Sequence, residues 1–243
     1  MEGTSLANTL EGSEHIPQII RIIDATVLSV IAIIGVLGNT LVFVAYTLSY
    51  KIRTKTNIFV VNLATADFLT CLFLPFVSWS LLIEVERVDG WLDLLCGLAM
   101  GLIQVFAACS MVTIFSIGVN RYILITRSRH TYNKLYRIKL ITLWIFFSWI
   151  YSILVITVPL MFNIGQLGFD IKIHACGTKT DHKLAHYYDL ILTITLAPLP
   201  GTVTACYAGI YLYVRKHNKR ILETYGLTRK TNGCHLSSEL NKR

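Results

Sequence analysis

An uncharged run of 23 residues, from Gly97 to Val119, is the feature that most limits how this chain can fold. As a helix rising ~1.5 Å per residue, the run is about 35 Å long, which exceeds the ~30 Å hydrocarbon core of a bilayer. Cys96 precedes the run, and Asn120, Arg121 and Tyr122 follow it directly. We therefore expect a transmembrane helix whose two ends lie in different compartments.

The composition of the whole chain indicates an integral membrane protein. Hydrophobic residues make up 54% of the 243 positions, and only 15% are charged, against about 25% in soluble domains. Four further apolar blocks accompany the first, so the predicted fold class is all-α, a bundle of transmembrane helices. The five expected spans are about 22–47, 57–82, 97–121, 140–162 and 187–214.

The distribution of cations predicts the topology. Of the 22 Lys and Arg residues, seventeen lie in segments 51–55, 121–139 and 215–243, and cytoplasmic loops are enriched in these residues. The N-terminus is therefore expected outside, with 1–21 as an extracellular tail and 215–243 as a basic cytoplasmic tail. The net charge of +8 suits anionic lipid or an acidic cytoplasmic partner, and no nucleic acid is needed to explain it.

The cysteines fall into two groups by expected compartment. Cys96 and Cys176 are the pair on the oxidising side, where disulfides persist. We expect a bond between them, which ties the outer end of the third span to the loop before the fifth, and two free thiols are the alternative. The other four lie in apolar spans or on the cytoplasmic side: Cys71, Cys109, Cys206 and Cys234.

Three polar residues are expected at one depth inside the bilayer. Asp67 lies ~15 Å from the inner end of its span, and Asn39 and Ser110 lie ~16–18 Å from theirs. A mid-membrane acid costs at least ~2.5 kcal/mol, so Asp67 needs compensation. A sodium ion held by Asp67 and Ser110 meets that need, and a protonated Asp67 within a hydrogen-bond network meets it equally.

The third span carries one continuous face from outside to inside. Ile103, Ala107, Ser110 and Arg121 share that face at helical spacing, although an ordinary packing face has the same pattern. The outer halves of other spans contain prolines, which bend helices and favour an outward cup where a small ligand binds. These prolines are Pro75, Pro159, Pro198 and Pro200.

The order of these motifs over residues 22–214 resembles a rhodopsin-like (class A) G-protein-coupled receptor. Asn120, where the family usually has Asp, is similar to melatonin-type receptors and several invertebrate orphan receptors. The motifs that carry the resemblance are Gly38-Asn39, Asn62-Leu63-Ala64-x-x-Asp67, Trp91, Cys96, Asn120-Arg121-Tyr122, Trp149, Pro159 and Cys176.

The resemblance implies a receptor in the plasma membrane, and not an enzyme, that transmits an extracellular ligand to a heterotrimeric G protein. Ile103 stands where amine receptors carry an acid, which argues against an amine ligand. No cofactor is implied beyond sodium as an allosteric ligand. The family sites map to a sodium pocket at Asp67, Asn39 and Ser110, G-protein contacts at Asn120, Arg121 and Tyr122, and a ligand pocket at Ile103, Gln104 and Ala107.

The segment after Tyr213 departs from the family because it is polar and contains no apolar block. Five spans are thus expected of the family's seven, which suggests a truncated gene model, a spliced short form or a degenerate copy. Such a form is expected not to signal alone, to be retained in the endoplasmic reticulum, and to pair with a full-length receptor. A transporter and a receptor-associated regulatory protein are the alternative functions.

Overall fold

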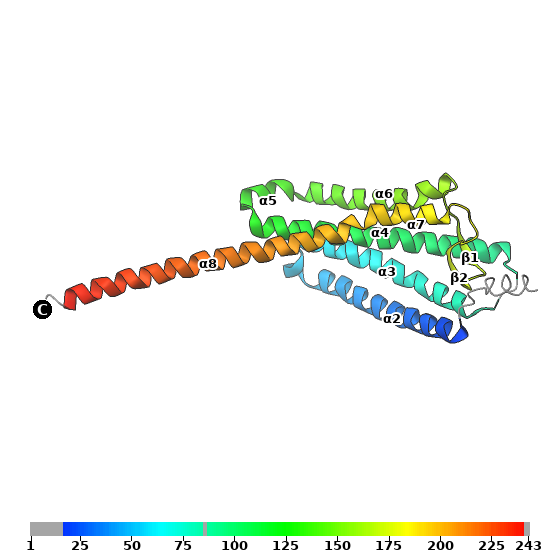
Figure 1. Cartoon of the computed structure of the whole chain (residues 1–243), viewed down its shortest axis with the longest axis horizontal. Coiled ribbons are helices and arrows are strands. Elements are labelled where there is room, and N and C mark those ends of the chain that lie inside the picture. The colour runs from blue at the N-terminus through cyan, green and yellow to red at the C-terminus, as the bar shows by residue number, and fades with distance from the viewer. Residues whose placement is uncertain (1–16, 85–86, 241–243) are drawn as a thin grey trace, which may run out of the picture.

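The structure, a computed structural model, describes residues 17–84 and 87–240 and is mainly helical (Figure 1). Within that part, five helical segments are long and apolar enough to cross a membrane, the last of them running from Ala185 to Ile221. The helices are α2 (Gln18–Leu48), η1 (Tyr50–Ile52), α3 (Lys55–Leu82), α4 (Gly90–Thr126), α5 (Arg129–Leu135), α6 (Ile138–Met161), α7 (Ala185–Leu196) and α8 (Pro198–Leu240). Two short strands, β1 (Leu167–Asp170) and β2 (Ala175–Thr178), add a hairpin that the all-α prediction did not contain.

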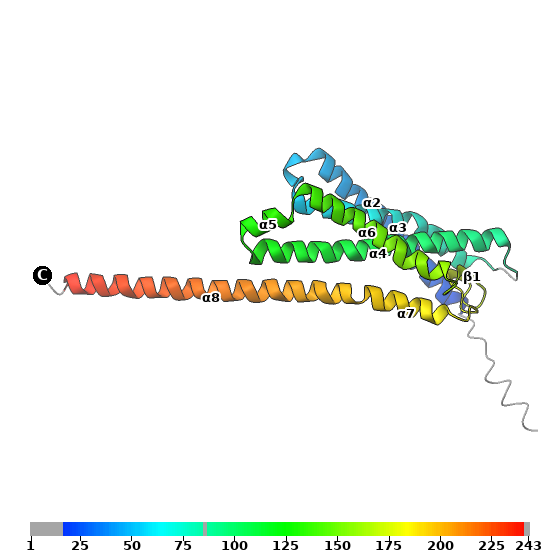
Figure 2. The same cartoon turned by 90° about the horizontal axis from the view of Figure 1, so that it is seen from above.

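Helix α4 is the centre of the bundle. It packs against α3, α6, α8 and strand β1, while α2 packs on the far side of α3. In Figure 2, α7 and α8 run along one side of α4, and α6 and α3 lie on the other. One helix therefore connects the extracellular hairpin with the short helix α5 at the opposite end.

Two helices differ from the expected spans at their ends. Helix α4 begins at Gly90 rather than near residue 97, because Asp93 in its first turn interacts favourably with the positive end of the helix dipole. The last helix continues beyond residue 214 to Leu240, so the backbone of the basic segment is helical. Residues 1–16 of the expected extracellular tail and residues 241–243 lie outside the described residues.

The prolines act in two ways. Pro75 and Pro159 lie inside α3 and α6, whereas Pro198 begins α8 after α7 has ended at Leu196. Proline has no backbone N–H to continue a helical ladder. With Pro200 two residues further on, this explains why the fifth span is made of two helices.

A buried arginine joins the outer ends of α2 and α3. Arg21 is only 5% exposed, and its guanidinium donates hydrogen bonds to the carbonyl oxygens of Leu81 (2.8 Å) and Ile83 (3.0 Å). The last carbonyls of a helix have no partner within it. Arg21 therefore caps α3 from the neighbouring helix, a role that its place at the end of the expected extracellular tail did not reveal.

Candidate functional site

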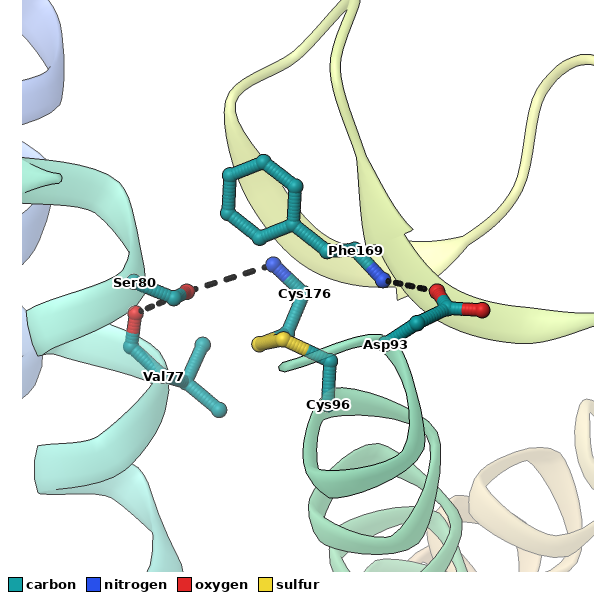
Figure 3. Close-up of a disulfide and its surroundings, with 6 residues drawn as sticks. All are labelled: Val77, Ser80, Asp93, Cys96, Phe169 and Cys176. Carbon is teal, nitrogen blue, oxygen red and sulfur yellow. Dashed lines mark hydrogen bonds between the residues drawn. A yellow bond between two sulfur atoms is a disulfide. The ribbon is translucent and has the colours of Figure 1, made fainter. Parts of the chain in front are cut away.

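The disulfide between Cys96 and Cys176 holds the hairpin against the outer end of α4, which confirms the predicted pairing (Figure 3). The backbone N–H of Cys176 also donates to the hydroxyl of Ser80 on α3, at 3.2 Å. Ser80 in turn donates to the carbonyl oxygen of Val77 within its own helix. Strand β2 is thus attached to two helices at one residue.

Asp93 provides a second attachment, between α4 and the other strand. Its carboxylate accepts a hydrogen bond from the backbone N–H of Phe169 at 3.0 Å (Figure 3) and forms an ion pair with Lys179 at 2.7 Å. Gly168 lies so close to Asp93 that a side chain there would collide with the carboxylate. Sequence reasoning missed this contact because 86 positions separate Asp93 from Lys179.

Asp170 organises the turn of the hairpin. Its buried carboxylate accepts hydrogen bonds from the backbone N–H (2.7 Å) and hydroxyl (2.6 Å) of Thr180 and from the backbone N–H of Lys172 (2.8 Å). Burial by itself raises the pKa of Asp170, but these hydrogen bonds to the charged form outweigh it and lower the pKa. The hairpin therefore contains an ionised acid at neutral pH.

The predicted ligand pocket lies below the hairpin, on α4. Gln104 accepts a hydrogen bond from the hydroxyl of Tyr188 on α7, and Tyr188 is fully buried. Ile103 is half-buried and Ala107 is exposed. Tyr188 was not among the residues predicted for this pocket, Ile103, Gln104 and Ala107, although a tyrosine at the outer start of the fifth span was a usable signal.

The predicted ion pocket is only partly assembled by direct contacts. Ser110 donates a hydrogen bond to the carboxylate of Asp67, whereas the amide of Asn39 donates to the carbonyl oxygen of Gly35 in its own helix at 2.9 Å. Gly35 touches Cys71, and Asn39 and Asp67 each lie one turn inward from that contact. Asn39 is therefore level with Asp67, but within the described chain it makes no hydrogen bond to that carboxylate.

The oxygen ligands in this pocket fit a sodium ion. A carboxylate and a hydroxyl are hard donors of the kind that such cations prefer. The hydrogen bond from Ser110 brings both donors to one point.

Three helices meet at Asn62, one turn from the ion pocket toward the inside. Its amide nitrogen donates to the hydroxyl of Thr113 on α4 at 2.8 Å, and its amide oxygen accepts from the indole of Trp149 on α6 at 3.0 Å. Both Asn62 and Thr113 are buried. This network fixes α3, α4 and α6 relative to one another.

At the inner end, the residues of the Asn120-Arg121-Tyr122 motif point in different directions. Asn120 is fully buried; it accepts from the hydroxyl of Thr56 at 3.0 Å and donates to the hydroxyl of Tyr132 on α5 at 3.4 Å. Tyr122 packs against Gly209 of α8. Arg121 is exposed, and no ion pair to it occurs among the described residues.

Two stacked tyrosines support Asn120 from the loop between α4 and α6. The rings of Tyr132 and Tyr136 are 5.0 Å apart, and Tyr136 also meets the ring of Phe59 edge-on at 6.5 Å. Burial raises the pKa of Tyr136 to about 12, so its phenol is neutral at physiological pH. The inner network therefore consists of uncharged groups.

The comparison with known families agrees with this arrangement. The profile described as 7 transmembrane receptor (rhodopsin family) matches residues 38–232, which is most of the chain. The chain belongs to this family of receptors and is a multi-pass membrane protein, not an enzyme.

Individual relatives support the same assignment. The melatonin receptor type 1C of Gallus gallus is 29% identical over 199 residues, covering 81% of this chain and 55% of the relative. The G-protein coupled receptor moody of Drosophila melanogaster is 31% identical over 193 residues, covering 79% of this chain and 28% of the relative. The chain spans about half the length, or less, of these relatives.

A solved structure supports the fold. Squid rhodopsin superimposes with a TM-score of 0.68 at 20% sequence identity, covering 88% of this chain and 58% of that one. At this identity the likeness concerns the arrangement of helices. Five of the family's seven transmembrane helices are present in the part of the chain that the structure describes.

Proposed function

We propose that this chain forms the ligand-binding and G-protein-contacting core of a receptor that transmits an extracellular, non-amine ligand to a heterotrimeric G protein at the plasma membrane. The observation that carries the proposal is the layout of α4. Gln104 lies under the hairpin and the exposed Arg121 lies at the inner end, about 26 Å away along one helix. A displacement of α4 at one end therefore reaches the other.

The ligand side of the proposal rests on uncharged groups. Ile103 cannot pair with an ammonium group, while Gln104 and Tyr188 offer a neutral hydrogen-bonding pair. A ligand that inserts between them exchanges one neutral hydrogen bond for another. A ligand with an amide or hydroxyl group fits this site better than an amine does.

The G-protein side rests on the separation of Asn120 from Arg121. Asn120 is a neutral amide, so it supplies no charge to hold its neighbour, and its side chain is engaged by Thr56 and Tyr132 instead. Arg121 is thus available to donate hydrogen bonds to carbonyl groups of a docked G protein. Exposed cations of the same inner surface, Arg127 and Arg129 among them, would attract an acidic partner.

A sodium ion at Asp67 and Ser110 is part of the proposal as an allosteric ligand. When bound, it would neutralise the carboxylate within the bilayer and so stabilise one arrangement of α3 and α4. A protonated Asp67 that keeps the hydrogen bond with Ser110 is the alternative. Loss of sodium-dependent ligand affinity in an Asp67→Asn variant, with the affinity in potassium unchanged, distinguishes the two.

The decisive experiment uses a chimera in which residues 1–221 are continued by the remaining part of the melatonin receptor type 1C of Gallus gallus. Ligand-independent nucleotide exchange on a G protein is measured in membranes. Arg121→Ala should lower the rate about tenfold, since a hydrogen bond to a charged group is worth ~1.5–3 kcal/mol. Arg87→Ala, which removes an exposed cation on the outer side of the bundle, is the matched control and should change the rate little. Equal rates for Arg121→Ala and the unmodified chimera would contradict the proposal.

A further inference from the structure

The segment between α4 and α6, residues 127–137, rests on the bundle through two tyrosines. Tyr132 and Tyr136 are buried and stack on each other with their rings 5.0 Å apart, whereas the other side chains of the segment are exposed. In Figure 1 this segment, which includes α5, lies at the end of the bundle opposite the hairpin. Its outward side is therefore accessible to cytosolic proteins.

This segment can open at a low cost in free energy. Helix α5 has only seven residues, and isolated helices shorter than ~12–15 residues are marginal in water. The hydroxyl of Ser128 accepts from the backbone N–H of Thr131 at 3.4 Å, and the hydroxyl of Tyr132 accepts from Asn120 at 3.4 Å. Both hydrogen bonds are longer than the usual ~2.7–3.2 Å. The segment can therefore reach the extended conformation in which protein kinases bind their substrates.

Thr131 has the surroundings of a kinase acceptor. Its side chain is exposed; Arg129 and Arg127 stand two and four residues before it, and Lys134 stands three residues after it. Kinases select their substrates partly by such charge patterns. Three cations around one hydroxyl fit a kinase whose substrate cleft is acidic, because complementary charges favour the encounter.

Thr54, in the loop 49–54 between α2 and α3, is a competing acceptor because it is also exposed and next to cations. However, its neighbour Arg53 donates to the carbonyl oxygens of Tyr46 (3.1 Å) and Thr47 (2.7 Å) at the end of α2. Thr54 itself caps the start of α3. This loop is therefore fixed by both helices and fits a kinase cleft less well.

A phosphate on Thr131 would have binding partners close by. Oγ of Ser128 lies 3.0 Å from Oγ1 of Thr131, so the Ser128 hydroxyl can donate to it. A phosphate adds about −1.5 to −2 of charge and three strong acceptor oxygens, and guanidinium groups match its geometry. Arg127 and Arg129 form no ion pair within the described chain, so both are available.

We propose that Thr131 is a phosphorylation site for a cytosolic kinase with an acidic substrate cleft, and that Arg127 and Arg129 then hold the phosphate. Oγ1 of Thr131 forms a bond to the γ-phosphorus of magnesium-bound ATP, and the bond from that phosphorus to the β,γ-bridging oxygen breaks. ADP leaves with the electron pair of the broken bond, and the hydroxyl proton passes to a carboxylate of the kinase. The phosphate offsets much of the local positive charge, so the inner surface attracts acidic partners less. The site itself does not depend on the receptor function proposed above.

Mapping the modified residue tests the site. The whole chain, in phosphatidylcholine nanodiscs, is incubated with magnesium ATP and the catalytic domain of a kinase that prefers arginine two residues before its acceptor. After digestion, mass spectrometry should find phosphate on Thr131. The modification should persist at that position in Thr131→Ser and disappear in Thr131→Val. Phosphate confined to Ser128, Thr54 or α8, or equal incorporation in Thr131→Val, would overturn the proposal.

Matched variants of two exposed arginines test the charge recognition. Arg129→Gln should lower the rate of phosphate incorporation about tenfold, because a charge-assisted hydrogen bond to the kinase is lost. Arg137→Gln removes an exposed cation of the same segment, six residues after the acceptor, and should leave the rate unchanged. Equal rates for the two variants would contradict recognition through Arg129.

Phosphorus NMR tests how the phosphate is held. The second pKa of a free phosphothreonine is about 6, and neighbouring guanidinium groups favour the dianion, so this pKa should be lower in the phosphorylated chain. Arg127→Gln should raise the pKa back toward the free value. The free value in both proteins would show that the arginines do not hold the phosphate.

Discussion

The two ends of α4 are held by different kinds of interaction. At the outer end, a disulfide from Cys96 and an ion pair between Asp93 and Lys179 fasten the hairpin. At the inner end, Asn120 reaches Thr56 and Tyr132 through neutral hydrogen bonds alone. Covalent and ionic contacts restrict movement more than single neutral hydrogen bonds, each of which is worth only ~0.5–1.5 kcal/mol net.

This difference suits a molecule that receives a ligand at one end and changes shape at the other. The attachment of the hairpin to α4 at the outer end should keep its geometry, and its stability should depend on redox state and pH. The inner end should rearrange at a low cost in free energy. Its stability should depend on neither redox state nor pH. The following predictions test this contrast.

The disulfide should contribute most to stability. Cys176→Ser should lower the free energy of unfolding by about 2–4 kcal/mol, because an unlinked chain gains conformational freedom when it unfolds. Thermal denaturation in detergent, with and without reductant, measures the loss. Cys206→Ser removes a free, half-buried thiol and serves as control. An equal loss in the two variants would contradict a special role for the bridge.

Asp170 should make the outer end acid-sensitive. Its pKa is lowered in the folded state, so its stabilising effect is present above the unfolded value of about 3.9 and is lost as the pH falls through the lower folded pKa. Asp170→Asn should cost ~1–3 kcal/mol at neutral pH, since hydrogen bonds to a charged acceptor are lost. Melting temperatures measured between about pH 6 and pH 3 should show a weaker acid dependence in the variant. The same acid dependence in both proteins would assign it to another group.

Substitutions in the inner network around Asn120 should lower the free energy of unfolding less than those at the outer end. Thr56→Val removes the hydroxyl that reaches Asn120 and should cost about 1 kcal/mol at every pH, because no charged group takes part. Thr65→Val is a matched control on the same helix, since within the described residues the hydroxyl of Thr65 bonds only to the carbonyl oxygen of Val61. Equal melting temperatures for the two variants would show that the contact with Asn120 adds nothing.

Asn120→Asp should produce the smallest change in free energy, and the change should appear in the basal rate of nucleotide exchange. The new carboxylate keeps the hydroxyl of Thr56 as a donor. The hydroxyl of Tyr132, which accepts from the amide of Asn120, must turn to donate to the carboxylate instead. The substitution also places a negative charge beside Arg121. A charge pair of this kind is worth ~0.2–1 kcal/mol, more when partly buried. In the chimera, basal nucleotide exchange should therefore fall by up to about fivefold. An unchanged or higher basal rate would mean that Arg121 is held in some other way.

The sequence by itself determined the membrane-spanning architecture. Uninterrupted apolar runs long enough for a bilayer leave few other folds, because every backbone polar group in lipid must be satisfied within a helix. The expected spans and the pairing of Cys96 with Cys176 followed from such local composition and from compartment. Asp67 and Ser110 also meet as their depths predicted.

Only the tertiary structure decided which polar groups have partners and which faces of α4 are occupied. Asn39 shares the depth of Asp67 but bonds to its own helix, and Gln104 pairs with Tyr188, 84 positions away. Depth along a helix follows from counting residues, whereas rotation about its axis and the approach of a distant loop depend on packing between helices. For the same reason, the ion pair of Asp93 with Lys179 emerged only once the helices and the hairpin were placed together.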